Sequence, residues 1–147
     1  MNRFLADIYG IERNSRMLVP NFVSAFDFWY GQLPVRKPAC PAIEAINNLA
    51  DAKTVYYRMP KEKGFGFDAS EFEKQITDKT RAAIILSPSN PTGRTLSRED
   101  LQTIAKILDG TGIYAVSDEI YKDIYFTDEK PASISEYYEK TLVVGGL

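Results

Sequence analysis

The chain has 147 residues, of which 44% are hydrophobic and 26% charged, and its formal net charge is −2. This balance is typical of a globular domain and argues against intrinsic disorder. It also argues against a dedicated nucleic-acid binder, which usually carries a basic excess. Histidine is absent and cysteine occurs once. Within this sequence, an imidazole base, an imidazole metal ligand, an internal disulfide and a zinc–thiolate cluster are therefore excluded, and we predict no metal site.

The sequence gives no sign of a membrane partner. No apolar run approaches the roughly 20 residues of a membrane span, and the N-terminus lacks the apolar stretch of a signal peptide. We therefore expect a cytoplasmic protein that contacts neither a membrane nor a nucleic acid.

The first half of the chain carries weaker secondary-structure signals than the second. Its candidates are two short helices and one strand, at residues 3–9, 23–30 and 54–59. Further on, Asp68 and Glu71 have the spacing of a capping box, in which two side chains satisfy free backbone N–H groups where a helix begins. This pair predicts a helix that continues to Ile76.

The clearest unit is a strand, a helix and a second strand between residues 82 and 117. Residues 82–86 and 113–116 are short apolar runs, typical of strands buried on both faces. Between them, Ser97 and Asp100 predict a helix start, and the helix presents one apolar face made of Leu101, Ile104, Ala105 and Leu108. The two strands should be parallel, with a right-handed crossover. Residues 141–144 are a further apolar β-type run.

Two polar segments follow the two strands of this unit. They read Ser-Pro-Ser-Asn-Pro-Thr-Gly at residues 87–93 and Ser-Asp-Glu-Ile-Tyr at residues 117–121. In an open parallel sheet, ligands bind beyond the carboxyl ends of the strands, so Asn90 and Asp118 should face one crevice. Taken singly, the first segment also fits a plain turn, and Asp118 also fits the N-cap of a helix over residues 119–125.

These two segments and the helix between them resemble the large domain of class I/II aminotransferases, which are pyridoxal-phosphate (PLP) enzymes of fold type I. The Phe-Gly-Phe-Asp segment at residues 65–68 adds to the likeness. The resemblance implies an α/β fold with three layers, α/β/α, around a mostly parallel sheet. It further implies that residues 1–147 form an incomplete large, PLP-binding domain.

The resemblance also implies roles for four residues. Asn90 and Tyr121 would donate hydrogen bonds to the phenolic oxygen of PLP, and Asp118 would pair with the pyridine nitrogen. Residues 18–25 resemble the turn that binds the cofactor's phosphate, where Ser24 would offer a hydroxyl and a backbone amide. The complete enzyme would be a homodimer that transfers an amino group between an amino acid and a 2-oxo acid.

Alternatives within this resemblance stay open. The family's cofactor-binding lysine would come just after Leu147, so no catalytic residue is assigned and the isolated chain is expected to be inactive. Phe22 stands where the family has a glycine, and Cys40 stands where it has an aromatic ring. Both favour a degenerate, non-catalytic paralogue that serves as a binding module or is a remnant. The motifs also fit another fold type I enzyme, such as a lyase or a cyclopropane-forming synthase.

Overall fold

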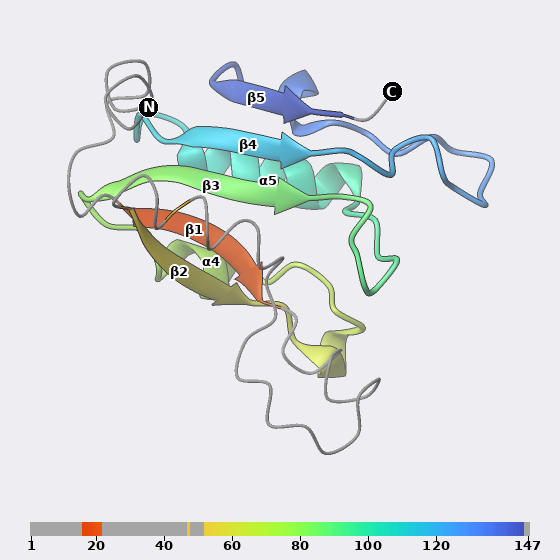
Figure 1. The fold of residues 1–147 in the computed structure, drawn as a ribbon, viewed down its shortest axis with the longest axis horizontal. Coiled ribbons are helices and arrows are strands. Elements are labelled where there is room, and N and C mark those ends of the chain that lie inside the picture. Colours follow the sequence, from red (N-terminus) through yellow and green to blue (C-terminus); the bar gives the residue numbers. More distant parts are fainter. Residues whose placement is uncertain (1–15, 22–46, 48–51, 146–147) are drawn as a thin grey trace.

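A computed structural model gives the fold and describes residues 16–21, 47 and 52–145. Its strands are β1 (Arg16–Asn21), β2 (Lys53–Arg58), β3 (Thr80–Leu86), β4 (Tyr114–Asp118) and β5 (Thr141–Val144). They form one sheet in the order β2-β1-β3-β4-β5, and every neighbouring pair is parallel (Figure 1). The predicted α/β class with a parallel sheet is therefore confirmed.

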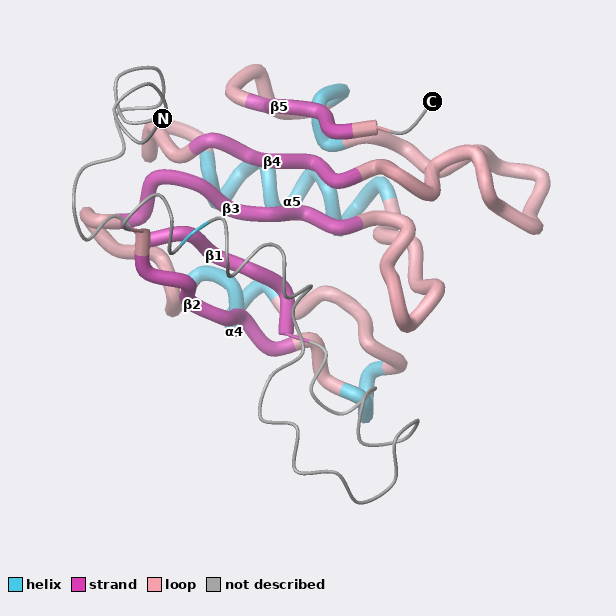
Figure 2. The backbone as a smooth tube through the Cα atoms, viewed as in Figure 1, coloured by secondary structure: helices cyan, strands magenta, loops and turns pink. Residues whose placement is uncertain are grey.

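The two described α-helices lie on one face of this sheet, and two short 3-10 helices accompany them (Figure 1). The α-helices are α4 (Ala69–Glu73) and α5 (Arg98–Leu108), and the 3-10 helices are η1 (Lys61–Lys63) and η2 (Ile134–Glu136). Figure 2 shows α4 and α5 on the same side of the strands, so the described residues supply the sheet and one helical layer. None of these helices is long and apolar enough to cross a membrane.

The predicted strand–helix–strand unit forms the centre of the fold as β3, α5 and β4. All four apolar residues predicted for the helix face are buried, and they belong to one core cluster with Ala83 and Ile85 of β3 and Ala115 of β4. At the start of α5, the backbone N–H of Ser97 donates to the Asp100 carboxylate at 3.0 Å, and the N–H of Asp100 donates to the Ser97 hydroxyl at 3.1 Å. This reciprocal pair confirms the predicted helix start.

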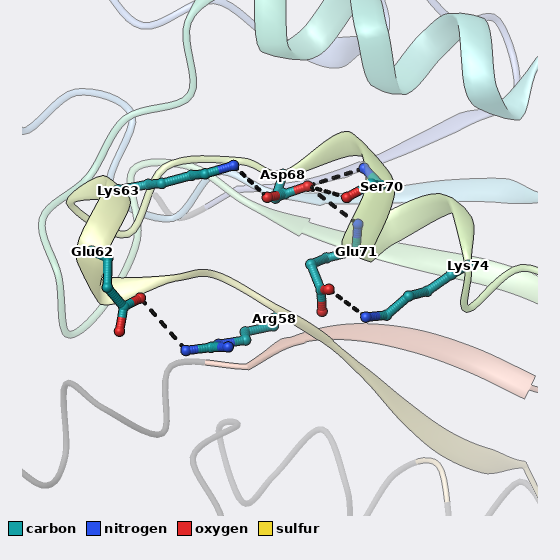
Figure 3. Close-up of polar contacts among 7 residues, drawn as sticks. All are labelled: Arg58, Glu62, Lys63, Asp68, Ser70, Glu71 and Lys74. Atoms are coloured by element: carbon teal, nitrogen blue, oxygen red, sulfur yellow. Dashed lines mark hydrogen bonds and ion pairs between the residues drawn. The ribbon is translucent and has the colours of Figure 1, made fainter.

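Helix α4 also begins where the sequence predicts, but its cap differs and the helix is shorter. The Asp68 carboxylate accepts from the backbone N–H groups of Ser70 and Glu71 at 3.1 and 3.3 Å (Figure 3). The Glu71 carboxylate, expected to complete the capping box, pairs with Lys74 instead. The helix ends at Glu73 rather than at Ile76, because the N–H groups of the residues after it, Gln75 and Ile76, make tighter i→i+3 hydrogen bonds.

The N-terminal predictions are only partly met. Residues 18–25 were expected to form a phosphate-binding turn, but residues 18–21 belong to β1. That strand pairs with β2 on one side and with β3 on the other, so backbone pairing on two sides holds it extended. The strand predicted at residues 54–59 is β2, shifted by one residue. The helices predicted at residues 3–9 and 23–30 lie outside the described residues.

Candidate functional site

The loop after β3 is closed by hydrogen bonds among its own residues. The N–H of Gly93 donates to the carbonyl of Ser89 at 2.7 Å, and the N–H of Ser89 donates to the carbonyl of Arg94 at 2.9 Å. Gly93 has φ +68°, in the left-handed region that favours glycine. The Ser87 hydroxyl accepts from the N–H of Leu96 at 3.0 Å. These bonds hold the exposed Asn90 at the tip of a compact loop.

Asp118 ends β4 at the same edge of the sheet. It lies opposite Leu86, the last residue of β3, and its carbonyl accepts from the N–H of Ser87 at 3.2 Å. Figure 1 shows that the loops after β3 and β4 both begin at this edge of the sheet. The Asp118 carboxylate is half-buried, and its Oδ1 accepts from the N–H of Ile120 at 3.3 Å. The alternative prediction of a helix over residues 119–125 is wrong, because short turns occupy this segment.

Asn90 and Tyr121 are in direct contact across the two loops. The Asn90 side-chain amide donates to the Tyr121 hydroxyl at 3.1 Å, although the two residues are 31 positions apart in the sequence. Tyr121 is half-buried and Asn90 is exposed. The contact therefore places an amide and a phenol, both able to donate hydrogen bonds, side by side at the edge that also carries Asp118.

An open pocket of about 610 Å³ lies between these two loops. Asn90 and Tyr121 belong to its lining, together with prolines and the exposed side chains of Tyr125 and Phe126. Asp118 is not part of the lining. The pocket thus adjoins the Asn90–Tyr121 pair, and Asp118 lies outside its lining at the end of β4.

The buried carboxylate of Glu119 is a feature that the sequence analysis did not single out. Glu119 is only 5% exposed, and it accepts hydrogen bonds from the hydroxyls of Ser117 and Ser133. The motif at residues 117–121 contains Glu119, but one of its two hydroxyl partners is Ser133, 14 residues later. No local pattern in the sequence signals that long-range contact.

Not every residue predicted for the site can be placed. Asn90, Asp118 and Tyr121 gather at one sheet edge, as described above. Ser24, predicted to bind phosphate, lies outside the described residues, as do Phe22 and Cys40. Among the residues that the structure does describe, no group of three or more acidic or cysteine side chains could hold a metal ion.

Comparison with known proteins places these features in a family. The family described as aminotransferase class I and II matches residues 34–147. The aspartate aminotransferase of Bacillus sp. (strain YM-2) is 40% identical over 103 residues, which cover 67% of this chain and 26% of that protein. The solved structure of the aromatic aminotransferase from Pyrococcus horikoshii OT3 is similar with a TM-score of 0.71 at 31% identity, over 99% of this chain and 36% of that one.

A second solved structure agrees. The alanine aminotransferase from Pyrococcus furiosus gives a TM-score of 0.74 at 26% identity, over 99% of this chain and 34% of that one. The chain thus spans about a third or less of the length of these relatives. The alternative of another fold type I enzyme is not better supported, because these relatives are all aminotransferases, and the comparisons add nothing that favours the degenerate paralogue. Since family match, fold and edge motifs agree, the chain belongs to the class I and II aminotransferase family, whose usual cofactor is PLP.

Proposed function

We propose that residues 1–147 are part of the PLP-binding domain of an aminotransferase. The complete enzyme would move an amino group between an amino acid and a 2-oxo acid. The hydrogen bond between Asn90 and Tyr121 carries this proposal, because it joins the two family motifs at one edge of the sheet. The family match over residues 34–147 supports it independently.

The chemistry of the described residues fits the cofactor. Asn90 and Tyr121 would donate hydrogen bonds to the anionic phenolic oxygen, and hydrogen bonds to a charged acceptor are the stronger kind. Asp118 would face the pyridine nitrogen and keep it protonated, because a nearby carboxylate favours the charged form of that nitrogen. When bound, PLP supplies an electron sink for the negative charge that develops at the substrate's reacting carbon. The residues of this chain orient the ring and set its charge.

The remaining assignments rest on the family alone. We propose Ser24 as a phosphate ligand and a homodimer as the assembled state, since the resemblance implies both. The cytoplasmic location and the absence of a nucleic-acid partner stay predictions from the composition.

Binding of a PLP analogue tests the proposal. We would use 4-deoxypyridoxine phosphate, which keeps the phenol, the ring nitrogen and the phosphate but has no aldehyde to react with surface lysines. We expect saturable binding by calorimetry, and at least tenfold weaker binding for Asp118→Asn, since loss of an ion-paired hydrogen bond removes about 1.5–3 kcal/mol. Asp109→Asn is the matched control, because Asp109 is exposed beyond the far end of α5. Absence of binding, or equal losses in both variants, would contradict the proposal.

A further inference from the structure

The carboxylate of Glu119 is fixed from two elements at once. Its Oε1 accepts from the Ser117 hydroxyl of β4 at 2.8 Å and from the hydroxyl of Ser133, the N-cap of η2. Its Oε2 lies 3.8 Å from the ammonium of Lys122. A buried carboxylate needs such partners, because desolvation of an unpaired charge is costly. The side chain therefore links the end of β4 to a segment 14 residues further along the chain.

The backbone of Glu119 is held as well. Its N–H donates to the carbonyl of Val144 on β5 at 2.8 Å, and its carbonyl accepts from the N–H of Lys122 at 3.0 Å. The second bond closes a turn over residues 119–122, and Tyr121 lies inside this turn. Glu119 is thus the anchored first residue of the segment that carries Tyr121 toward Asn90.

We propose that Glu119 is a positioning residue for the cofactor site. It acts through the turn over residues 119–122 and keeps the Tyr121 hydroxyl within hydrogen-bonding distance of Asn90. The expected effect of Glu119 on cofactor binding rests on the proposed function, whereas its effect on the Asn90–Tyr121 contact does not. Glu119 itself would touch neither cofactor nor substrate. Its carboxylate matters because it ties the turn to Ser133.

The side-chain amide resonance of Asn90 in ¹⁵N NMR spectra of the ligand-free chain reports directly on this contact. Asn90→Asp identifies the resonance by removing it, and Tyr121→Phe shows where it moves when the hydrogen bond is lost. We expect Glu119→Ala and Ser133→Ala to move the resonance by at least half of the Tyr121→Phe displacement. Glu119→Gln should leave it near the wild-type position, because the glutamine oxygen can still accept from both serine hydroxyls.

Ser135→Ala is the matched control. The Ser135 hydroxyl lies 2.7 Å from that of Ser133, but no described hydrogen bond joins it to Glu119, so we expect no movement of the Asn90 resonance. If Glu119→Ala unfolds the chain, the Asn90 resonance of Ser133→Ala still tests the proposal, because this variant leaves residues 117–122 unchanged in sequence. A lower melting temperature with an unmoved Asn90 resonance would show a purely structural role and overturn the proposal.

The same variants separate this inference from the proposed function. Where the chain binds 4-deoxypyridoxine phosphate, we expect Ser133→Ala to weaken binding at least fivefold and Ser135→Ala to leave it unchanged. If the wild-type chain binds no analogue, the proposed function fails, and the Asn90 resonance still tests the role of Glu119. If binding is strong and Ser133→Ala changes neither affinity nor resonance, only the inference about Glu119 is overturned.

Discussion

The hydroxyl of Tyr57 on β2 donates a hydrogen bond to the carbonyl of Ile84 on β3 at 3.0 Å, although β1 lies between these two strands. The pairing of β1 with β3 extends only as far as Ala83. Ile84 is therefore the first residue of β3 beyond that ladder, and the buried phenol satisfies its carbonyl. The Tyr57 ring also packs edge-on against Phe72 of α4, with the ring centroids 5.0 Å apart.

Tyr57→Phe should destabilise the chain without changing its fold. The substitution keeps the ring and removes the hydroxyl, which leaves the Ile84 carbonyl without this partner in the core. An unsatisfied buried polar group costs about 1–3 kcal/mol, so we expect a loss of that size in the free energy of unfolding by urea. Tyr125→Phe is the control, because Tyr125 is 41% exposed. Equal losses in both variants would argue against a role for the buried bond.

Tyr57 also predicts a loss of stability at alkaline pH. Burial raises its pKa above the ordinary value of 10.0, so the phenol ionises more readily in the unfolded chain than in the folded one. The unfolded state then binds fewer protons above pH 10, and stability falls as the pH rises through that range. Urea unfolding between pH 8 and 11 measures this slope. Tyr57→Phe should show a shallower slope, and an unchanged slope would exclude Tyr57 as its source.

The second half of the fold could be predicted from local sequence signals, and β1 could not. Strands β3, β4 and β5 are each indicated by a local run of four or five mostly apolar residues, and the Ser97–Asp100 pair marks the start of α5. Strand β1 contains Pro20 and ends in the polar Asn21, which locally favour a turn. Its extended form depends on pairing with strands that begin 37 and 64 residues after its own first residue, at Lys53 and Thr80.

The candidate site likewise has features that local sequence predicts and features that depend on distant contacts. The motifs at residues 87–93 and 117–121 could be found from the sequence, because the end of a parallel strand predicts where a ligand binds. The contact between Asn90 and Tyr121 depends on the register of β3 against β4, which aligns Leu86 with Asp118. The contact of Glu119 with Ser133 joins two residues 14 positions apart across an irregular connection, and no periodic pattern encodes it.

The cap of α4 predicts a loss of stability in acid. A hydrogen bond from Lys63 is the main cause that holds the pKa of Asp68 below its ordinary value of 3.8. The stabilisation is therefore present above about pH 4 and is lost as the pH falls further, because the unfolded state binds the proton first. Asp68→Ala should cost about 1 kcal/mol at neutral pH, as is typical for an N-cap.

A second variant separates the cap from the charge. Asp68→Asn can still accept from the N–H groups of Ser70 and Glu71 but cannot pair with Lys63 (Figure 3). We expect it to retain most of the neutral-pH stability and to lose the acid dependence. Urea unfolding at pH 3 and pH 7 measures both effects. Asp78→Ala, at an exposed position, is the control, and an equal loss in that variant would contradict the assignment to the cap.

The Asn90–Tyr121 contact predicts coupled effects on ligand binding. Both side chains would donate to the phenolic oxygen of the cofactor, and the Asn90 amide donates to Tyr121 in the free chain. Asn90→Ala and Tyr121→Phe should each weaken binding of 4-deoxypyridoxine phosphate by about tenfold, the effect of roughly 1.4 kcal/mol. The double variant should lose less than the hundredfold product, because the residues share an acceptor and orient one another. Calorimetric titration of the four proteins gives the coupling energy. Strictly multiplicative losses would mean that the two residues act independently, and the proposed shared acceptor would then be wrong.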